Sequence, residues 1–156
     1  MRLNRGEIDE QGRLRLVGRL KKEFKTSKGK YVAPSQIENV LALSTIFESV
    51  AVFGSGMTSP FAITVLVPNK REESESPAQQ QSITTEVRTA VERTNAQLEH
   101  HEHLRFIVLC KQPWTPENGI MTPTLKVRRA LLEQRLSQQF AVWEKSGRDV
   151  IWIDSV

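Results

Sequence analysis

The stretch from Ser49 to Val67 reads SVAVFGSGMTSPFAITVLV. It contains two apolar runs, Ser49–Phe53 and Phe61–Val67, separated by a segment rich in glycine and serine. Apolar runs of this length, bounded by turn-forming residues, are typical of buried strands. We expect the two runs to pair as antiparallel neighbours in a small sheet.

Apolar periodicity predicts the remaining elements on both sides of this pair. Pro34 suits the first turn of a helix, where its missing N–H costs nothing. The predicted helices cover Pro34–Leu43, Ile83–Leu98 and Leu125–Phe140, the last with Leu125, Leu132 and Leu136 on one stripe. The further predicted strands are an N-terminal hairpin of Gly6–Glu10 and Arg13–Val17 around Gln11-Gly12, a short strand at Glu23-Phe24-Lys25, a buried strand at Leu104–Cys110, and a last strand or packed extension at Asp149–Val156.

The polar segments are interpreted as connections. Asn69–Ser82 is low in complexity and is expected to be a mobile surface loop. Lys111–Thr124 contains three prolines and is expected to be a long ordered loop. Gln36 and Glu38 are expected to cap or decorate a helix. The fold class that follows is α+β, a small antiparallel or mixed sheet with an N-terminal β-hairpin and about three packing helices.

Composition excludes several classes of protein. The chain has 156 residues, a formal net charge of +4 and a single cysteine, Cys110. An internal disulfide and an all-cysteine metal site are therefore excluded, and Cys110, inside an apolar run, is expected to be a core thiol. No apolar stretch approaches the roughly 20 residues that span a bilayer, and the N-terminus lacks a secretory signal. We expect a cytoplasmic protein, with membrane-peripheral placement of a complete enzyme as the alternative.

The positive charge is concentrated near the N-terminus. Arg13–Lys30 contains eight cations and one acidic residue, Glu23. Such a block is either a solvated face or an anion site, and composition does not choose between them. Nucleic-acid binding is the weaker interpretation, because only Phe24 and Tyr31 interleave the cations and no nucleic-acid-binding motif is present. His100, His101 and His103 lack a second cluster of ligands, so no metal site is predicted.

Two islands of sequence carry the functional signal. The first is GRLKKEFKTSKGKYVAPSQIEN (Gly18–Asn39), and the second is PENGIMTPTLKVRR (Pro116–Arg129). Together they resemble the C-terminal domain of the adenylate-forming enzymes, and in detail the long-chain fatty-acyl-CoA synthetases. The resemblance covers roughly residues 6–136.

The resemblance implies roles for individual residues. Lys126 matches the lysine that neutralises charge as a carboxylate attacks the α-phosphate of ATP. Arg19 matches the arginine that contacts the nucleotide ribose, and Lys21 matches the hinge about which the small domain rotates between half-reactions. The loop Lys25–Lys30, with Lys25 and Gly29, matches the segment that meets the pantetheine channel during thioester formation.

The resemblance also implies substrates and a partner. The complete enzyme would use ATP with Mg²⁺, coenzyme A and a long-chain fatty acid, and would contain a large N-terminal adenylation domain in cis or in trans. Residues 1–18 are assigned to the hairpin and hinge approach, 19–140 to the C-terminal domain, and 141–156 to a C-terminal extension. No cofactor is expected in the isolated chain.

The chain departs from the family pattern at its start. The usual threonine-glycine-aspartate before the hairpin is replaced by Arg2-Leu3-Asn4-Arg5. We therefore expect an excised domain or a truncated gene product that is catalytically inactive alone. The alternative hypothesis is a non-catalytic stand-alone module with the same fold that binds a protein partner.

Overall fold

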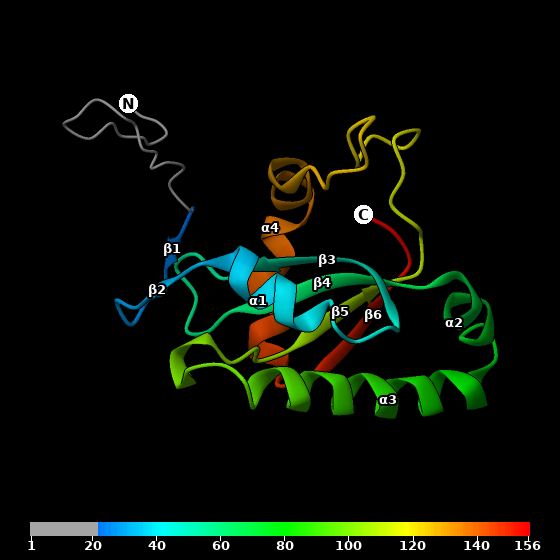
Figure 1. The fold of residues 1–156 in the computed structure, drawn as a ribbon, viewed down its shortest axis with the longest axis horizontal. Coiled ribbons are helices and arrows are strands. Elements are labelled where there is room, and N and C mark those ends of the chain that lie inside the picture. Colours follow the sequence, from blue (N-terminus) through cyan, green and yellow to red (C-terminus); the bar gives the residue numbers. More distant parts are fainter. Residues whose placement is uncertain (1–21) are drawn as a thin grey trace, which may run out of the picture.

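The computed structural model describes residues Lys22–Val156. The predicted hairpin of Gly6–Glu10 and Arg13–Val17 lies outside the described residues, as do Arg19 and Lys21. The prediction of an α+β fold is confirmed, with four α-helices, a two-stranded antiparallel sheet and a four-stranded mixed sheet in the described part. Figure 1 shows the arrangement of these elements.

The four-stranded sheet is built around the predicted antiparallel pair. Its order is β3-β4-β5-β6, and β3 pairs antiparallel with β4, whereas β4–β5 and β5–β6 are parallel. Because β4 and β5 are buried over their whole length, their sequences read as continuous apolar runs. The strands are β3 (Phe47–Phe53), β4 (Phe61–Leu66), β5 (Ile107–Cys110) and β6 (Val150–Ile153).

Helices cover both faces of this sheet. The first face packs against α1 (Pro34–Leu41) and α3 (Pro77–Asn95), whose Ile37, Leu41 and Val87 are buried. The second face packs against α4 (Arg129–Ser146) and the connection that precedes it. Figure 1 shows α1 in front of the sheet and α4 behind it. The sheet is therefore the middle layer between two separate apolar clusters.

A small hairpin lies against the connection between β3 and β4. It is formed by β1 (Phe24–Lys25) and β2 (Tyr31–Val32), which confirms the predicted short strand. The Phe24 ring lies against Gly54, where an added Cβ would come within 2.8 Å of the ring. Glycine at position 54 therefore permits this hairpin to approach the sheet closely.

The prediction of a loop over Asn69–Ser82 is wrong. The segment contains α2 (Pro68–Glu73) and the beginning of α3, each with proline in the first helical turn. Its glutamate, glutamine and lysine residues are good helix formers, which outweighs the low complexity of the sequence. Lys70 also forms an ion pair with Glu86 of α3, with 3.0 Å between the charged atoms.

Two further boundaries differ from the prediction. Leu125 is not part of α4, which begins at Arg129, and its side chain is 64% exposed, whereas Leu132 and Leu136 are buried as predicted. The predicted helix end at Phe140 is too early, because α4 continues to Ser146. The predicted last strand is present as β6, which pairs with β5 at the edge of the sheet. The proposed domain boundaries at 18 and 140 remain predictions.

Candidate functional site

Lys126 lies on a short, hydrogen-bonded turn that immediately precedes α4. The backbone N–H of Thr122 donates to the carbonyl of Lys126 at 2.8 Å, and the N–H of Leu125 donates to the carbonyl of Thr122 at 2.8 Å. The side chain of Thr122 accepts a further bond from the N–H of Lys126. The Lys126 side chain is exposed. The chain thus presents this cation on an ordered turn.

The conformation of Leu125 explains why the helix starts later than predicted. Its φ of +65° is in the left-handed region, which a helix cannot incorporate. Three residues, Pro123 to Leu125, connect the paired Thr122 and Lys126, and a left-handed third residue is typical of three-residue hairpins. The turn therefore places Lys126 before the helix rather than in its first turn.

The connection leading to this turn is a long ordered loop, as predicted. Asn118 accepts hydrogen bonds from the N–H groups of Thr115 and Ile120, and its side-chain amide donates to the carbonyl of Pro113 at 2.9 Å. Trp114 and Ile120 are buried against the sheet. These contacts fix both ends of the connection to the domain.

Lys25 and Gly29 lie on the β1–β2 hairpin. The N–H of Gly29 donates to the carbonyl of Thr26 at 3.0 Å, and the N–H of Thr26 donates to the carbonyl of Lys30 at 2.9 Å. Gly29 has a φ of +82°, and apart from its two chain neighbours no atom of the described residues lies within 4 Å of where its Cβ would be. The turn therefore requires glycine for its backbone conformation rather than for internal space. Lys25 Nζ lies 5.6 Å from the centre of the exposed Tyr31 ring.

The β1–β2 hairpin begins near the start of α4. Lys22, just before β1, lines one pocket with Val127 and Arg128. Phe24 of β1 lines another pocket with Arg129, the first residue of α4. The hairpin that carries Lys25 and Gly29 therefore begins beside the segment that carries Lys126. Arg19 and Lys21, the other two candidates, lie outside the described residues.

Glu38 connects α1 to β3 and to the start of α4. It was expected to cap or decorate a helix, yet its Oε2 accepts a hydrogen bond from the N–H of Val52 at 2.8 Å and pairs with Arg129. Arg129 also donates to the carbonyl of Val52. Sequence reasoning assigned Arg129 no role, although it closes the second island.

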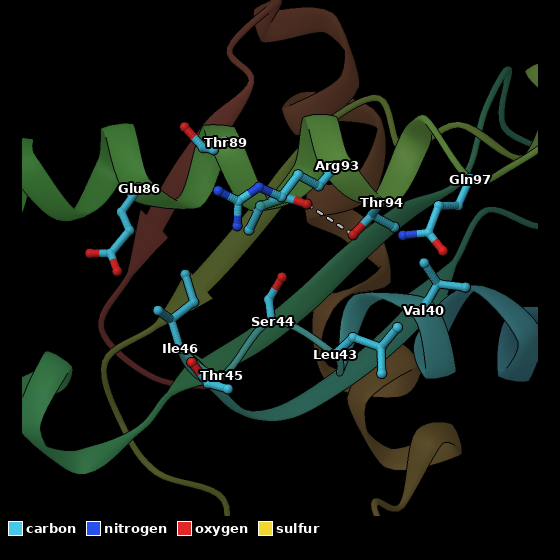
Figure 2. A pocket seen from close by; sticks show the side chains of 11 residues that line it. Val40, Leu43, Ser44, Thr45, Ile46, Glu86, Thr89, Arg93, Thr94 and Gln97 are labelled. Carbon is cyan, nitrogen blue, oxygen red and sulfur yellow. Dashed lines mark hydrogen bonds between the residues drawn. The ribbon is translucent and has the colours of Figure 1, made fainter.

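A surface groove borders α1 and α3. It has a volume of about 400 Å³ and lies between α3 and the turn from α1 to β3. Figure 2 shows Glu86 and Arg93 of α3 facing Thr45 and Ile46 of that turn. The Thr94 hydroxyl bonds to the carbonyl of Ala90 in its own helix. Of the sequence-predicted site residues that the structure describes, Lys25, Gly29 and Lys126, none lines this groove.

The remaining features concern the single cysteine, metal binding and membrane spans. Cys110 is 2% exposed, as predicted for a core thiol, and burial raises the pKa of its thiol. Within Lys22–Val156, no group of three or more histidine, cysteine, aspartate or glutamate side chains is arranged to hold a metal ion. None of the helices in the same residues combines the length and apolar character that a membrane span needs.

The similarity to known proteins falls largely on the residues that the structure describes. The family profile described as the AMP-binding enzyme C-terminal domain matches residues 22–141. Fatty acyl-CoA synthetase A of Dictyostelium discoideum is 30% identical, and the alignment covers 93% of this chain and 25% of that protein. Long-chain-fatty-acid–CoA ligase 5 of Rattus norvegicus is 29% identical, with 88% and 22% covered. The chain thus spans about a quarter of the length of these relatives.

A solved structure has the same fold. The adenylation domain of the carboxylate reductase from Mycobacterium chelonae superimposes with a TM-score of 0.70 at 22% sequence identity. The match covers 86% of this chain and 21% of that one. At this identity the likeness concerns the fold alone.

Proposed function

The chain belongs to the AMP-binding enzyme C-terminal domain family, and from this we propose that it is the mobile C-terminal domain of a long-chain fatty-acid–CoA ligase. In the proposed reaction a fatty-acid carboxylate oxygen attacks the α-phosphorus of ATP, and pyrophosphate leaves. The thiol of coenzyme A then attacks the acyl carbon of the acyl-adenylate, and AMP leaves. The similarity to fatty acyl-CoA synthetases supports the choice of substrates.

The observation that carries the proposal is the placement of Lys126. The turn that carries this exposed cation is fixed by three hydrogen bonds, Thr122 N–H to Lys126 carbonyl among them, so the backbone at Lys126 is ordered before a substrate arrives. Negative charge grows on the α-phosphate as the carboxylate attacks, and a preorganised cation stabilises that charge without reorganising. We therefore assign Lys126 to adenylation.

The proposal assigns the second half-reaction to the β1–β2 hairpin. Lys25 and Gly29 would meet the pantetheine channel during thioester formation, with Arg19 on the ribose and Lys21 as the hinge. In this proposal the Lys126 turn serves adenylation and the β1–β2 hairpin serves thioester formation. A rotation about the hinge would present them in turn.

The partner in this proposal is a large adenylation domain, in cis or in trans. It would hold ATP, the acyl chain and coenzyme A opposite the cations of this domain. Mg²⁺ would accompany ATP. Because no cluster of metal-ligating side chains occurs within Lys22–Val156, we assign no ligand of that ion to the described residues.

The two half-reactions of a complete ligase carrying this domain test the proposal separately. Lys126→Ala is expected to slow pyrophosphate exchange on the order of 100- to 1000-fold, because one preorganised charge is lost. Lys21→Pro should slow thioester formation more than adenylation, because proline fixes φ and blocks rotation at the hinge. Lys145→Ala, which removes an exposed lysine from the last turn of α4, is the matched control.

Two results would contradict the assignments. Unchanged pyrophosphate exchange in Lys126→Ala would remove the adenylation role. Equal slowing of both half-reactions in Lys21→Pro would remove the hinge role. The isolated chain is expected to release no pyrophosphate from ATP and a fatty acid, because positioning by the large domain is missing.

A further inference from the structure

Two charged side chains close over the free edge of the four-stranded sheet. Among the described residues β3 is the edge strand of this sheet, so the backbone groups of Val52 that face outward have no strand partner there. The N–H of Val52 donates to Glu38 Oε2 at 2.8 Å, and its carbonyl accepts a bond from Arg129 Nη2. Arg129 Nη1 in turn donates to Glu38 Oε2. We call this closed ring of three hydrogen bonds the edge clasp.

The edge clasp joins the two helical layers. Glu38 belongs to α1, on the first face of the sheet, and Arg129 is the first residue of α4, on the second face. The Arg129 guanidinium also lies 4.8 Å from the centre of the Phe53 ring. A planar guanidinium makes two directed hydrogen bonds and a face contact at once, which a lysine ammonium cannot reproduce. The start of α4 is therefore fixed in position and in orientation.

The Lys126 turn is attached directly to this fixed point. Only two residues, Val127 and Arg128, separate Lys126 from Arg129. The N–H of Arg128 donates to the carbonyl of Ile120 at 2.8 Å, and Val127 bridges to Met121. The segment is thus held by backbone pairing on one side and by the edge clasp on the other.

From this geometry we propose that Glu38 and Arg129 are positioning residues for Lys126. The proposal rests on the adenylation role assigned to Lys126 above. In it, the edge clasp sets where the turn projects from the domain, so that the lysine ammonium reaches the reacting phosphate. Misplacement of a catalytic group by about 1 Å can cost on the order of 100-fold in rate.

A purely structural role predicts a different pattern of effects. If the edge clasp only protected the strand edge and stabilised the domain, its loss would impair both half-reactions alike, whether or not Lys126 is present. A positioning role predicts that the loss affects adenylation selectively. It also predicts that the loss has no further effect once the Lys126 ammonium has been removed.

Amide hydrogen exchange of the 156-residue chain tests the first link, from the edge clasp to the turn. In Arg129→Gln and Glu38→Gln, the amides of Leu125 and Lys126 should exchange at least about tenfold faster, as expected for the loss of a charged hydrogen bond. The amides of Val108 and Leu109 in the central strand β5 should keep their protection. Arg135→Gln, on the exposed face of α4, is the matched control. Unchanged exchange at Leu125 and Lys126 would overturn the inference.

Kinetics of a complete ligase carrying this domain test the second link, from the turn to the chemistry. Arg129→Gln should slow pyrophosphate exchange on the order of 10- to 100-fold, with acyl transfer from preformed acyl-adenylate within about twofold. In a Lys126→Ala background the same change should alter pyrophosphate exchange less than about twofold. Arg129→Lys should recover only part of the rate, since it keeps the charge but not the two-pronged geometry.

The outcomes separate this inference from the proposed function. Equal slowing of both half-reactions, or the same loss with and without Lys126, would overturn the positioning role and leave the adenylation role of Lys126 intact. Unchanged pyrophosphate exchange in Lys126→Ala alone would overturn the proposed function, and the catalytic meaning of the edge clasp with it.

Discussion

The hydroxyl oxygen of Thr122 accepts a hydrogen bond from the backbone N–H of Lys126, at a distance of 3.0 Å. The same hydroxyl lies 3.1 Å from that of Thr124. The side chain of Thr122 therefore closes the turn in addition to the backbone bond between the same two residues. This arrangement gives a physical role to the threonines that flank Pro123 in the second island.

Thr122→Val is expected to loosen this turn. Valine has nearly the same shape as threonine but offers no acceptor, so the Lys126 N–H loses one partner at a cost of about 0.5–1.5 kcal/mol in the local opening free energy. Hydrogen exchange at Lys126 should accelerate accordingly. Thr122→Ser keeps the acceptor and is the control. Equal exchange at Lys126 in the valine and serine variants would contradict a closing role for the hydroxyl.

The strands and main helices could be predicted because their signals are local. β4 and β5 read as unbroken apolar runs since both of their faces are buried, and α3 shows the helical spacing of its buried face. The prediction of a loop over Asn69–Ser82 is wrong because the helix propensity of its glutamate, glutamine and lysine residues outweighs its low complexity. The late start of α4 depends on the left-handed backbone conformation of Leu125, which an apolar pattern does not predict.

The candidate site could be predicted only in part. The sequence context predicts Lys126, and its role stays a prediction; the structure adds that this residue is exposed on an ordered turn. The edge clasp could not be found, because Glu38 and Arg129 are 91 positions apart. A charged residue on a helix gives the same local pattern whether it faces water or a distant strand edge, so the partner appears only in the folded chain.

The C-terminal strand is expected to be essential for stability. Ile151 is 5% exposed and pairs with Val108, and Trp152 Nε1 donates to Thr84 Oγ1 of α3 at 3.0 Å. Ile151→Ala should lower the free energy of unfolding by about 2–5 kcal/mol, measured by chemical denaturation. Val142→Ala, at a site 58% exposed, should change it by less than about 0.5 kcal/mol. If the C-terminal strand were dispensable, the denaturation curves of Ile151→Ala and Val142→Ala would be indistinguishable.

Cys110 is expected to be inert in the folded chain. Burial raises the pKa of its thiol, and its Sγ lies 3.4 Å from the carbonyl of Gln112. The thiolate is the reactive form, and burial reduces the fraction of thiolate. Burial also keeps reagents away from the sulfur, so both effects slow modification. Reaction with an aromatic disulfide reagent at pH 8 should be slower than in the unfolded chain by on the order of 100-fold or more, because exposure requires local opening. Labelling of the folded chain at the unfolded rate would contradict the buried placement.

The ion pair of Arg88 and Asp149 is expected to contribute to acid sensitivity. Arg88 Nε lies 2.7 Å from Asp149 Oδ2, and this hydrogen bond lowers the pKa of the Asp149 carboxyl. A carboxyl whose pKa is lower in the folded than in the unfolded state stabilises the fold above the unfolded pKa, near 4. That stabilisation is lost as the pH falls through the folded pKa. The pair joins α3 to the residue before β6, so its loss would loosen the contact between them.

The pH dependence of the urea midpoint measures this contribution. The difference in midpoint between pH 6 and pH 3 should be smaller in Arg88→Gln and in Asp149→Asn than in the unchanged chain. The effect should be modest and should shrink in 1 M salt, because both side chains are about half exposed and solvent screens them. Asp154→Asn, at a side chain 94% exposed, is the control and should leave the difference unchanged. If Arg88→Gln left the acid sensitivity unaltered, or if Asp149→Asn increased it, the pair would have no role in stability at neutral pH.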